Sequence, residues 1–246
     1  MKKGTVMLLA LGWMAETAFT LHAQNVSFYR NAPKEPKVNL GVKAGFNSTT
    51  FFIGRLTVDG HPIEHLQNNY KVGVLGAFFV RFNIRKHHFL QSELSYNLSN
   101  GSIAAADKEE NTDLLDGSAS VKSKSHSIAI PLLYGYKFVD AYPYQMSFFV
   151  GPQVAYYWKK HMHNEYSGFF QQGINERRHL FGAAAVLGLA VNITNLFIDF
   201  RYEIGLHNLA KSVVYDTVAT PSPYNEQELY IKRRKNVLSF SLGVIF

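Results

Sequence analysis

The chain of 246 residues contains no cysteine, and only 17% of its residues are charged. The absence of cysteine excludes a disulfide scaffold, a thiol nucleophile, a cysteine-based zinc site and a lipid-modified cysteine. Long apolar runs are also missing, because outside the first 25 residues none approaches the roughly 20 residues that a membrane-spanning helix requires. A membrane protein with this sequence must therefore cross the bilayer as strands.

Aromatic residues are abundant, with 19 phenylalanines and 14 tyrosines in a chain that is 47% hydrophobic. This composition is unlike that of a disordered or highly solvated chain. A chain of this length can bury a full core as one all-β domain.

The N-terminus has the layout of a secretory signal peptide. Lys2 and Lys3 precede an apolar stretch over 6–14, and the small residue Ala23 stands before Gln24. This layout favours an exported chain cleaved after Ala23 over a membrane anchor, because Glu16 interrupts the apolar run. We expect three parts, namely a signal peptide at 1–23, a periplasmic N-terminal linker at 24–37 and an outer-membrane β-barrel at 38–246.

The last ten residues alternate most clearly between two unlike faces, which is typical of a strand. The apolar face carries Leu238, Phe240, Leu242, Val244 and Phe246. The opposite face carries Ser239, Ser241 and Gly243.

The same alternation predicts three further strands at 38–46, 90–98 and 196–206. Four segments are strand-like with less regular faces, at about 70–83, 123–138, 145–158 and 179–193. A helix over 182–191 is the main local alternative, because its alanines and leucines favour helix. Pro131 and Pro152 each remove a backbone donor, which suggests a bulge or a locally broken pairing.

The connections between these eight segments alternate strictly in length. The long ones are 48–69, 99–122, 159–178 and 207–234, and the short ones are 84–88, 139–144 and 194–195. Outer-membrane barrels sort their connections in this way, with tight periplasmic turns and longer outer loops. We therefore predict an all-β, eight-stranded, antiparallel, up-and-down transmembrane β-barrel of OmpA/OmpX-like size. An even strand number places both barrel termini in the periplasm.

Residue type indicates which face points into the barrel. In each predicted strand the face opposite the bulky apolar one carries small and polar residues. These polar faces, with nearby charged residues, would supply a lumen polar network of Lys43, Arg81, Glu93, Lys137, Asp199, Arg201 and Glu203. Small and mixed-sign side chains suit the narrow interior of an eight-stranded barrel, so a plugged lumen is favoured over an open pore or over acid–base chemistry by the carboxylates. The bulky faces suit hydrocarbon, with aromatic girdles drawn from Tyr134, Tyr136, Tyr156, Tyr157, Trp158 and Tyr202.

Several segments together resemble a known family. They are Ala23-Gln24, the strands at 40–47 and 130–138, the Val150-Gly151-Pro152 step and the terminal Phe246. The chain resembles the small outer-membrane β-barrels of Bacteroidetes, grouped as PorT or "porin family" proteins, a name that does not itself imply a pore.

This resemblance implies the cell outer membrane as location and Phe246 as the signal for the outer-membrane insertion machinery. It also implies participation in a secretion or outer-membrane assembly complex such as type IX secretion.

Ten histidines raise the question of a metal site. His61 with His65, His161 with His163, and the pair at 87–88 are weak candidates without a third ligand, so we expect no metal and no cofactor. His126 lies between Ser125 and Ser127, an arrangement similar to that of outer-membrane lipid deacylases. Neighbouring strand residues point to opposite faces, however, so Ser127 and His126 would not meet directly.

The chain has a net charge of +7, and ten of its Lys and Arg residues fall at the expected outer mouth. An outer-mouth basic ring would comprise Lys122, Lys124, Lys159, Lys160, Arg177, Arg178, Lys232, Arg233, Arg234 and Lys235. Lys and Arg pair well with phosphate, so this ring is predicted to contact lipopolysaccharide, with simple loop solubility as the equally weighted alternative. Nucleic-acid binding is not expected of an exported chain without a nucleic-acid fold signature.

The sequence therefore predicts an integral outer-membrane protein with no enzymatic activity. It would act as a structural or accessory subunit with a protein partner in a membrane complex, surrounded by outer-membrane lipid and lipopolysaccharide. Two alternatives stay open, namely a lipid A-modifying outer-membrane enzyme and a soluble lipocalin-like ligand binder.

Overall fold

The structure, a computed structural model, describes residues 35–63, 66–105, 115–116, 118–158, 163–208 and 210–246. The chain divides into two compact units, Met1–Glu35 and Pro36–Phe246, and the description below concerns the second. The expected signal peptide at 1–23 and all but the end of the expected linker lie outside the described residues. Among the described residues, no helix has the length and apolar character needed to span a membrane.

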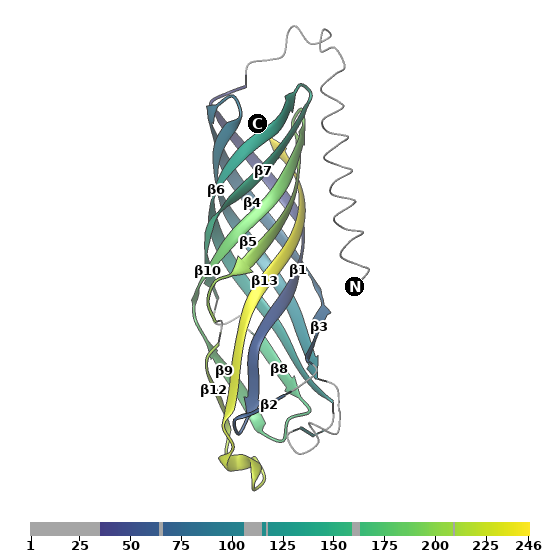
Figure 1. Cartoon of the computed structure of the whole chain (residues 1–246), viewed down its shortest axis with the longest axis vertical. Helices are drawn as coiled ribbons and strands as arrows, with labels where there is room; N and C mark the ends of the chain where they lie inside the picture. The colour runs from purple at the N-terminus through teal and green to yellow at the C-terminus, as the bar shows by residue number, and fades with distance from the viewer. Residues whose placement is uncertain (1–34, 64–65, 106–114, 117, 159–162, 209) are drawn as a thin grey trace. The chain divides into compact units, whose positions relative to one another are not determined.

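Eight strands form the wall of a barrel. They are β1 (Val38–Val58), β4 (Val72–Arg85), β5 (His88–Ala105), β6 (Ala119–Ala141), β7 (Tyr144–Tyr157), β10 (Phe181–Ile193), β11 (Leu196–Gly205) and β13 (Leu229–Ile245). Each strand pairs antiparallel with the next wall strand along the chain, and β1 pairs with β13 to close the ring, for example at Phe46 opposite Phe240. The predicted eight-stranded, antiparallel, up-and-down barrel is confirmed (Figure 1).

Smaller elements gather at one end of this barrel. They are β2 (His61–Pro62), β3 (Leu66–Tyr70), β8 (His163–Ser167), β9 (Gln172–Arg178), β12 (Ala210–Asp216) and the 3-10 helix η4 (Tyr224–Glu226). We call this end the loop end. The opposite end, which we call the turn end, carries the short turns 86–87, 142–143 and 194–195 together with the start of β1 and the end of β13.

Each of the eight expected segments lies within a wall strand apart from one or two residues at its ends. The helical alternative for 182–191 is wrong, because these residues belong to β10. Next to Pro131, the pairing of β5 with β6 skips from Ser92 opposite Leu132 to Ser95 opposite Ala129 without a change of register. The expected disturbance at this proline is therefore a locally broken pairing and not a bulge.

The predicted extent of three long loops is wrong in part, because wall strands continue into the ranges 48–69, 99–122 and 207–234. β1 runs on to Val58, β5 runs on to Ala105, and β13 already begins at Leu229. The alternation reverses there: Leu229 and Ile231 point inward and are buried, whereas Lys232 and Arg234 point outward and are exposed. A search for strands whose apolar residues face outward therefore finds only one part of each of these strands. It misses the part in which the apolar residues face inward.

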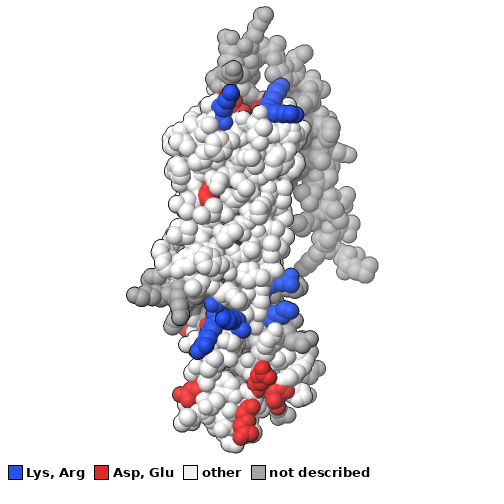
Figure 2. Space-filling view, turned by 90° about the vertical axis from the view of Figure 1, so that its left-hand side faces the viewer, with Lys and Arg blue, Asp and Glu red and all other residues white. Residues whose placement is uncertain are grey.

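The outward face of the barrel is apolar over most of its length. One exposed residue from each wall strand illustrates this, each between 44% and 55% exposed: Val42, Phe78, Leu94, Leu132, Phe148, Leu189, Phe200 and Leu242. Figure 2 shows a broad, nearly uncharged zone between two levels of Lys and Arg side chains. We call this zone the apolar band. Such a continuous surface would be a fault in water but suits hydrocarbon.

The expected aromatic girdle is correct in part. Tyr134, Tyr156 and Trp158 are exposed on the outward face of the barrel. Tyr157 is a correction, because it is only 9% exposed and points into the lumen. The strand period of two places it on the face opposite to that of Tyr156 and Trp158.

Three apolar clusters occupy the interior. The turn-end cluster comprises Phe79, Phe89, Leu133, Phe149, Val186, Ala190, Phe197 and Ile245. The middle cluster comprises Phe51, Ile103, Val121, Ala129, Ala155 and Tyr157. The loop-end cluster comprises Leu56, Val58, Ile63, Leu115, Ala119, Leu229 and Ile231, against which side chains of β3, β8, β9 and β12 pack. The part of the barrel beyond the apolar band thus has its own core.

The seam between β1 and β13 leaves no room for a side chain at Gly45. A Cβ atom there would lie 2.1 Å from the Phe240 carbonyl oxygen and 2.6 Å from the Ser241 Cα. We expect Gly45→Ala to destabilise the folded barrel by about 1–3 kcal/mol, the usual effect of overpacking. The measurement is the urea midpoint of refolded protein in detergent. Gly76→Ala is the matched control, because its Cβ would meet only the Lys43 carbonyl oxygen at 4.0 Å. Equal midpoints for the two variants would contradict the close approach at the seam.

Candidate functional site

Four charged side chains meet inside the barrel at the level of the apolar band. Lys43 Nζ lies 3.0 Å from Glu93 Oε2 and 2.7 Å from Asp199 Oδ2. Arg201 donates to Glu93 through both terminal nitrogens, at 3.1 and 2.9 Å, and also to Asp199. These side chains are at most 5% exposed, and two positive charges balance two negative ones. We call this group the central ion cluster.

Neighbouring side chains extend the central ion cluster across the lumen. Arg81 Nε donates to Gln91 Oε1 at 2.7 Å, and Gln91 Nε2 donates to Glu93 Oε1 at 2.7 Å. The Arg81 guanidinium also lies over the Phe89 and Phe197 rings, at 4.3 and 5.1 Å from their centroids. The charged layer therefore rests directly on the turn-end apolar cluster, and hydrogen-bonded partners offset its desolvation.

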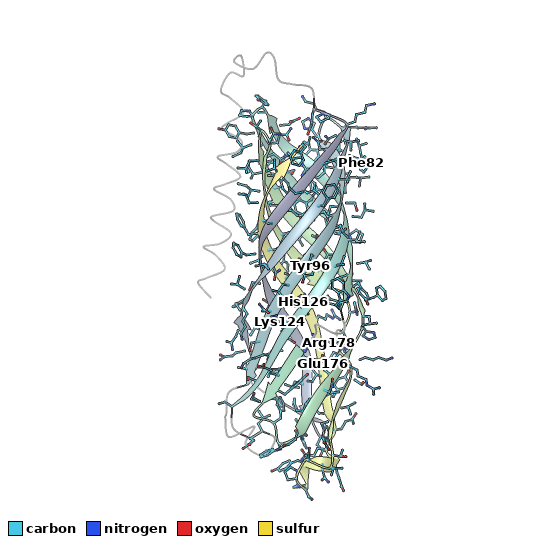
Figure 3. All side chains as sticks on the ribbon, turned by 180° about the vertical axis from the view of Figure 1, so that it is seen from behind. Phe82, Tyr96, Lys124, His126, Glu176 and Arg178 are labelled. Carbon is cyan, nitrogen blue, oxygen red and sulfur yellow. The ribbon has the colours of Figure 1, made fainter. Side chains whose placement is uncertain are left out.

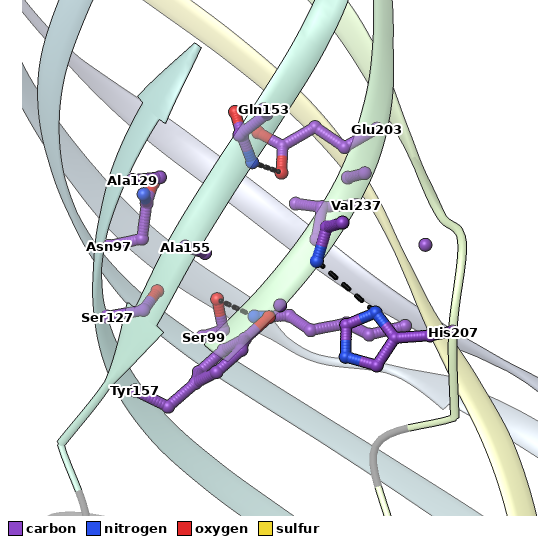
Figure 4. Close-up of a pocket in the computed structure, with 15 residues that line it drawn as sticks. Asn97, Ser99, Ser127, Ala129, Gln153, Ala155, Tyr157, Glu203, His207 and Val237 are labelled. Atoms are coloured by element: carbon purple, nitrogen blue, oxygen red, sulfur yellow. Dashed lines mark hydrogen bonds between the residues drawn. The ribbon is translucent and has the colours of Figure 1, made fainter. Parts of the chain in front are cut away.

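The other two residues expected in the lumen network are Lys137 and Glu203. Lys137 on β6 is buried at 1% exposure. Glu203 on β11 is partly exposed and accepts a hydrogen bond from Gln153 Nε2 at 2.7 Å (Figure 4). The structure thus places six of the seven expected side chains in buried positions and Glu203 beside a hollow.

The expected basic ring is divided between the two faces of the wall. Lys122, Lys124, Arg177, Lys232 and Arg234 point outward and are exposed, and Lys159 and Lys160 lie outside the described residues. Arg178, Arg233 and Lys235 point into the barrel, so the prediction that they belong to a ring on the outer surface is wrong. Consecutive strand residues alternate between faces, so a run of basic residues cannot all face the same surroundings.

The inward-pointing arginines share a single carboxylate near the loop end. Glu176 Oε2 accepts from Arg178 Nη2 at 3.3 Å, from Tyr166 Oη at 3.0 Å and from Asn164 Nδ2 at 2.9 Å, and Arg233 donates to the same oxygen. We call Glu176, Arg178 and Arg233 the arginine cluster. Figure 3 shows Glu176 and Arg178 toward the loop end, beyond Tyr96 and His126.

Burial and charge shift the pKa values around the arginine cluster, which lies beyond the apolar band. Burial would raise the pKa of Glu176, but Arg233 and Arg178 outweigh it and hold that pKa below its ordinary value. Burial lowers the pKa of Lys235 to about 8, with Arg178 adding to the shift and Glu203 opposing it. In this part of the lumen the two arginines share the single carboxylate of Glu176, and Lys235 lies nearby as a third cationic side chain.

Two adjoining hollows lie between the central ion cluster and the arginine cluster. The larger has an empty volume of about 530 Å³ including its mouth, and its lining includes Gln153, Glu203 and His207 (Figure 4). The smaller, of about 310 Å³ including its mouth, is lined in part by Thr49 and Arg178. Ser99, Tyr157 and Lys235 line both hollows. The sequence does not predict these hollows. A hollow forms where side chains from different strands do not fill the space between them, and no local sequence pattern indicates such a place.

The histidines singled out from the sequence have ordinary structural contacts. His126 points outward, its Nδ1 lies 2.6 Å from Tyr96 Oη, and Ser127 points inward at 3% exposure. The two residues of the deacylase alternative therefore do not meet. His87 Nδ1 lies 3.1 Å from the Lys137 carbonyl oxygen, and His88 Nδ1 lies 2.6 Å from Tyr134 Oη.

The other two candidate pairs, His61 with His65 and His161 with His163, each include a residue outside the described part of the chain, namely His65 and His161. No group of three or more His, Cys, Asp or Glu side chains that could hold a metal ion occurs in the described part of the chain.

Comparisons with known proteins bear on the fold. A family model described as "outer membrane protein beta-barrel domain" matches residues 22–211. The outer membrane protein OprG of Pseudomonas aeruginosa has a similar structure, with a TM-score of 0.50, 10% identity, and coverage of 85% of this chain and 95% of that one. Neisserial surface protein A is similar at a TM-score of 0.36 and 13% identity, with 85% and 97% covered. No curated protein sequence matches the chain.

Removal of one charge from the central ion cluster tests how strongly its members depend on one another. We expect Asp199→Asn to lower the free energy of unfolding by on the order of 3–5 kcal/mol, because Lys43 and Arg201 would then share one carboxylate. The measurement is equilibrium urea unfolding in detergent.

Glu165→Gln is the control for Asp199→Asn. Glu165 pairs with Lys122 at 3.4 Å on the exposed surface, so its loss should change the free energy of unfolding by less than about 1 kcal/mol. Similar effects for the two variants would show that burial does not strengthen the central pairs.

Proposed function

Since the chain belongs to the outer membrane protein β-barrel domain family, we propose that it is a non-catalytic and non-conducting structural or accessory subunit that holds a folded platform at the cell surface. The observation that carries this proposal is the succession of side-chain layers inside the barrel. The turn-end apolar cluster is followed by the central ion cluster, the middle apolar cluster, the arginine cluster and the loop-end apolar cluster.

The succession can be followed along single strands. β13 contributes Ile245 to the turn-end cluster, Arg233 to the arginine cluster and Ile231 to the loop-end cluster. β1 contributes Lys43 to the central ion cluster and Val58 to the loop-end cluster. An eight-stranded barrel is only wide enough for side chains to fill, and the layers of described side chains, with two small hollows among them, support a plugged lumen.

The reversal of the outward face supports the orientation that we propose. Beyond the apolar band, the loop end has apolar residues inside and charged residues outside, as a soluble domain does. We place this end outside the cell, with the turn end and both barrel termini in the periplasm after removal of residues 1–23. The outward Lys122, Lys124, Lys232 and Arg234 then stand where lipopolysaccharide carries its phosphates, and Lys and Arg pair with such groups.

The loop end has the features of a platform for a protein partner. Its apolar core fixes β9 and β12 beside the barrel, and surface segments on a rigid scaffold are where binding specificity usually lies. The tip exposes the acidic residues Asp59, Asp216, Glu226 and Glu228, the red group farthest from the turn end in Figure 2. We propose that the partner contacts this tip.

The resemblance to the PorT group is the basis for naming type IX secretion or outer-membrane assembly as the setting of the partner complex. Within this proposal, Phe246 serves the outer-membrane insertion machinery. It is 66% exposed on the outward face, and its backbone N–H donates to the Leu40 carbonyl oxygen at 2.7 Å, so the residue stands at the end of the closing seam.

Two alternatives have less support. A lipid A-modifying enzyme would need a nucleophile next to its base, and Ser127 and His126 point to opposite sides of the wall. A soluble lipocalin-like binder would have its apolar faces inside, whereas here the exposed residues of the apolar band are Leu, Val and Phe.

A filled lumen should not conduct ions. We expect the refolded protein in planar bilayers to show no large stepwise conductance, because an eight-stranded barrel whose interior is filled by side chains is too narrow for a water channel. The measurement is single-channel recording, with a large porin as the positive control for insertion. Reproducible large steps from the purified barrel would overturn the plugged lumen.

The partner and lipid contacts can be tested in one experiment. We expect tagged protein, extracted in mild detergent, to co-purify with lipopolysaccharide and with a stable protein partner. The triple variant Lys124→Gln, Lys232→Gln, Arg234→Gln should lose lipopolysaccharide, by about fivefold for each removed charge if each contributes about 1 kcal/mol. Quantification of bound lipopolysaccharide and mass spectrometry of bound proteins give the result.

The matched control for this co-purification removes the same charge at the turn end. Lys37→Gln, Arg85→Gln, Lys86→Gln changes exposed residues there and should leave lipopolysaccharide binding unchanged. An equal loss in both triple variants would contradict the proposed orientation, and a barrel that purifies without any partner would contradict the accessory role.

A further inference from the structure

The smaller hollow lies inside the wall at the level where the outward face has become charged. Its lining includes Thr49 and Phe51 of β1, Ser123 of β6, Arg178 of β9 and Lys235 of β13. Lys235 neighbours the outward Arg234, and Ser123 neighbours the outward Lys124. The hollow is therefore beyond the apolar band, at the height proposed above for lipid headgroups.

Polar groups around this hollow lack partners within the described part of the chain. Arg178 Nε and Thr49 Oγ1 are buried without a hydrogen bond, and the Arg178 side chain is only 4% exposed. Lys235 Nζ donates one hydrogen bond, to Ser99 Oγ at 2.9 Å, although an ammonium group has three donors. Buried donors in folded proteins are normally satisfied, so this group of unsatisfied donors calls for an acceptor.

Arg233 stands directly behind the hollow and adds to the same deficit. It is fully buried, its guanidinium lies 4.6 Å from the centroid of Phe51, and it donates to Ser123 Oγ at 3.3 Å. Arg233 Nε and Nη1 have no hydrogen-bond partner in the described structure. Both Phe51 and Ser123 line the hollow, so the charge of Arg233 acts on its contents.

The charges around the hollow do not balance. Arg178, Arg233 and Lys235 supply three positive charges, and Glu176 is the carboxylate that contacts the two arginines. Glu203 lines the other hollow, where Gln153 donates to it. Two guanidinium groups sharing one carboxylate oxygen repel one another, and a second anion beside them would offset this repulsion.

The two hollows open near a pair of histidines. His179 lines the smaller hollow and His207 the larger, and their ring centroids are 6.0 Å apart. His207 Nδ1 accepts from the Ala183 backbone N–H at 3.2 Å, as the dashed line in Figure 4 shows. The histidines lie where the paired wall is interrupted, since β10 begins at Phe181 and β11 ends at Gly205.

We propose that the hollow bounded by Arg178, Lys235, Ser99, Ser123 and Thr49 is a binding site for a single oxyanion of the phosphate class, entered from the side past His179. A phosphate presents several acceptor oxygens and up to two negative charges. It would accept from Arg178 Nε, Thr49 Oγ1 and Lys235 Nζ, and it would neutralise the excess positive charge. Guanidinium and ammonium groups together form the usual surroundings of bound phosphate.

The site is separate from the proposed platform and compatible with a plugged lumen. The central ion cluster and the turn-end apolar cluster separate the hollow from the turn end, and the loop-end apolar cluster separates it from the tip. The hollow is thus a side chamber of the lumen. Phosphate could come from the solution or from a lipid headgroup at the same height.

The test is titration of inorganic phosphate into the purified barrel in detergent, followed by isothermal calorimetry at constant ionic strength. We expect one saturable site. Arg178→Gln and Lys235→Gln should each weaken binding on the order of tenfold or more, because each removes a charged hydrogen-bond donor.

The controls are Arg177→Gln and Arg234→Gln, which remove the same charge from the adjacent outward-facing position and should change affinity less than about twofold. Absence of saturable binding to the unaltered protein would overturn the proposal, and so would an equal loss in inward and outward variants. The result on the unaltered protein decides the matter even if an inward variant fails to fold.

The source of the phosphate is decided by competition. Short-chain phosphatidic acid, added to the detergent, should displace inorganic phosphate if headgroups enter the chamber, and short-chain phosphatidylcholine serves as the control lipid. Displacement by phosphatidic acid alone supports a headgroup as the ligand. Saturable phosphate binding without displacement supports free phosphate, and displacement by both lipids equally would show that the binding is not specific to the side chamber.

Discussion

The pairing of Lys43 and Arg201 with Glu93 and Asp199 is the interaction on which the barrel depends. The outward face of the wall is apolar at this height, so the charged side chains of these strands can only point inward. A lumen this narrow excludes most water, which makes each charge unfavourable unless an opposite charge contacts it. The balanced cluster satisfies this condition inside the lumen.

The same constraint explains why the interior changes in character along the barrel. Where the wall faces outward with apolar residues, the lumen holds the balanced ion cluster. Toward the loop end, the outward residues are charged, and the interior becomes the apolar cluster around Val58, Ile63 and Leu229. The region between them contains the arginine cluster and the hollows, where positive charge exceeds its partners. The proposed platform and the proposed side chamber are therefore compatible with the proposed plugged lumen.

Sequence periodicity predicted the wall strands well, because lipid-facing residues differ strongly in type from lumen-facing ones. It failed at the ends of β1, β5 and β13, where apolar and polar residues exchange faces and the chain looks like a loop. It also failed at Arg178, Arg233 and Lys235, because a run of basic residues does not by itself indicate the outer surface. The rule that neighbouring strand residues point in opposite directions would have divided that run, had these segments been recognised as strands.

The sequence by itself determined the number of wall strands, the alternation of connection lengths and the inward direction of the charges at the level of the apolar band, such as Lys43, Glu93 and Asp199. These properties follow from local patterns, since the strand period and the turn lengths involve only residues close together in the chain. Only the tertiary structure decided which charges pair, that Glu176 serves two arginines, and that Lys235 borders a hollow. Those facts depend on residues far apart in the chain, whose distances are set by barrel closure and by the register of every strand between them.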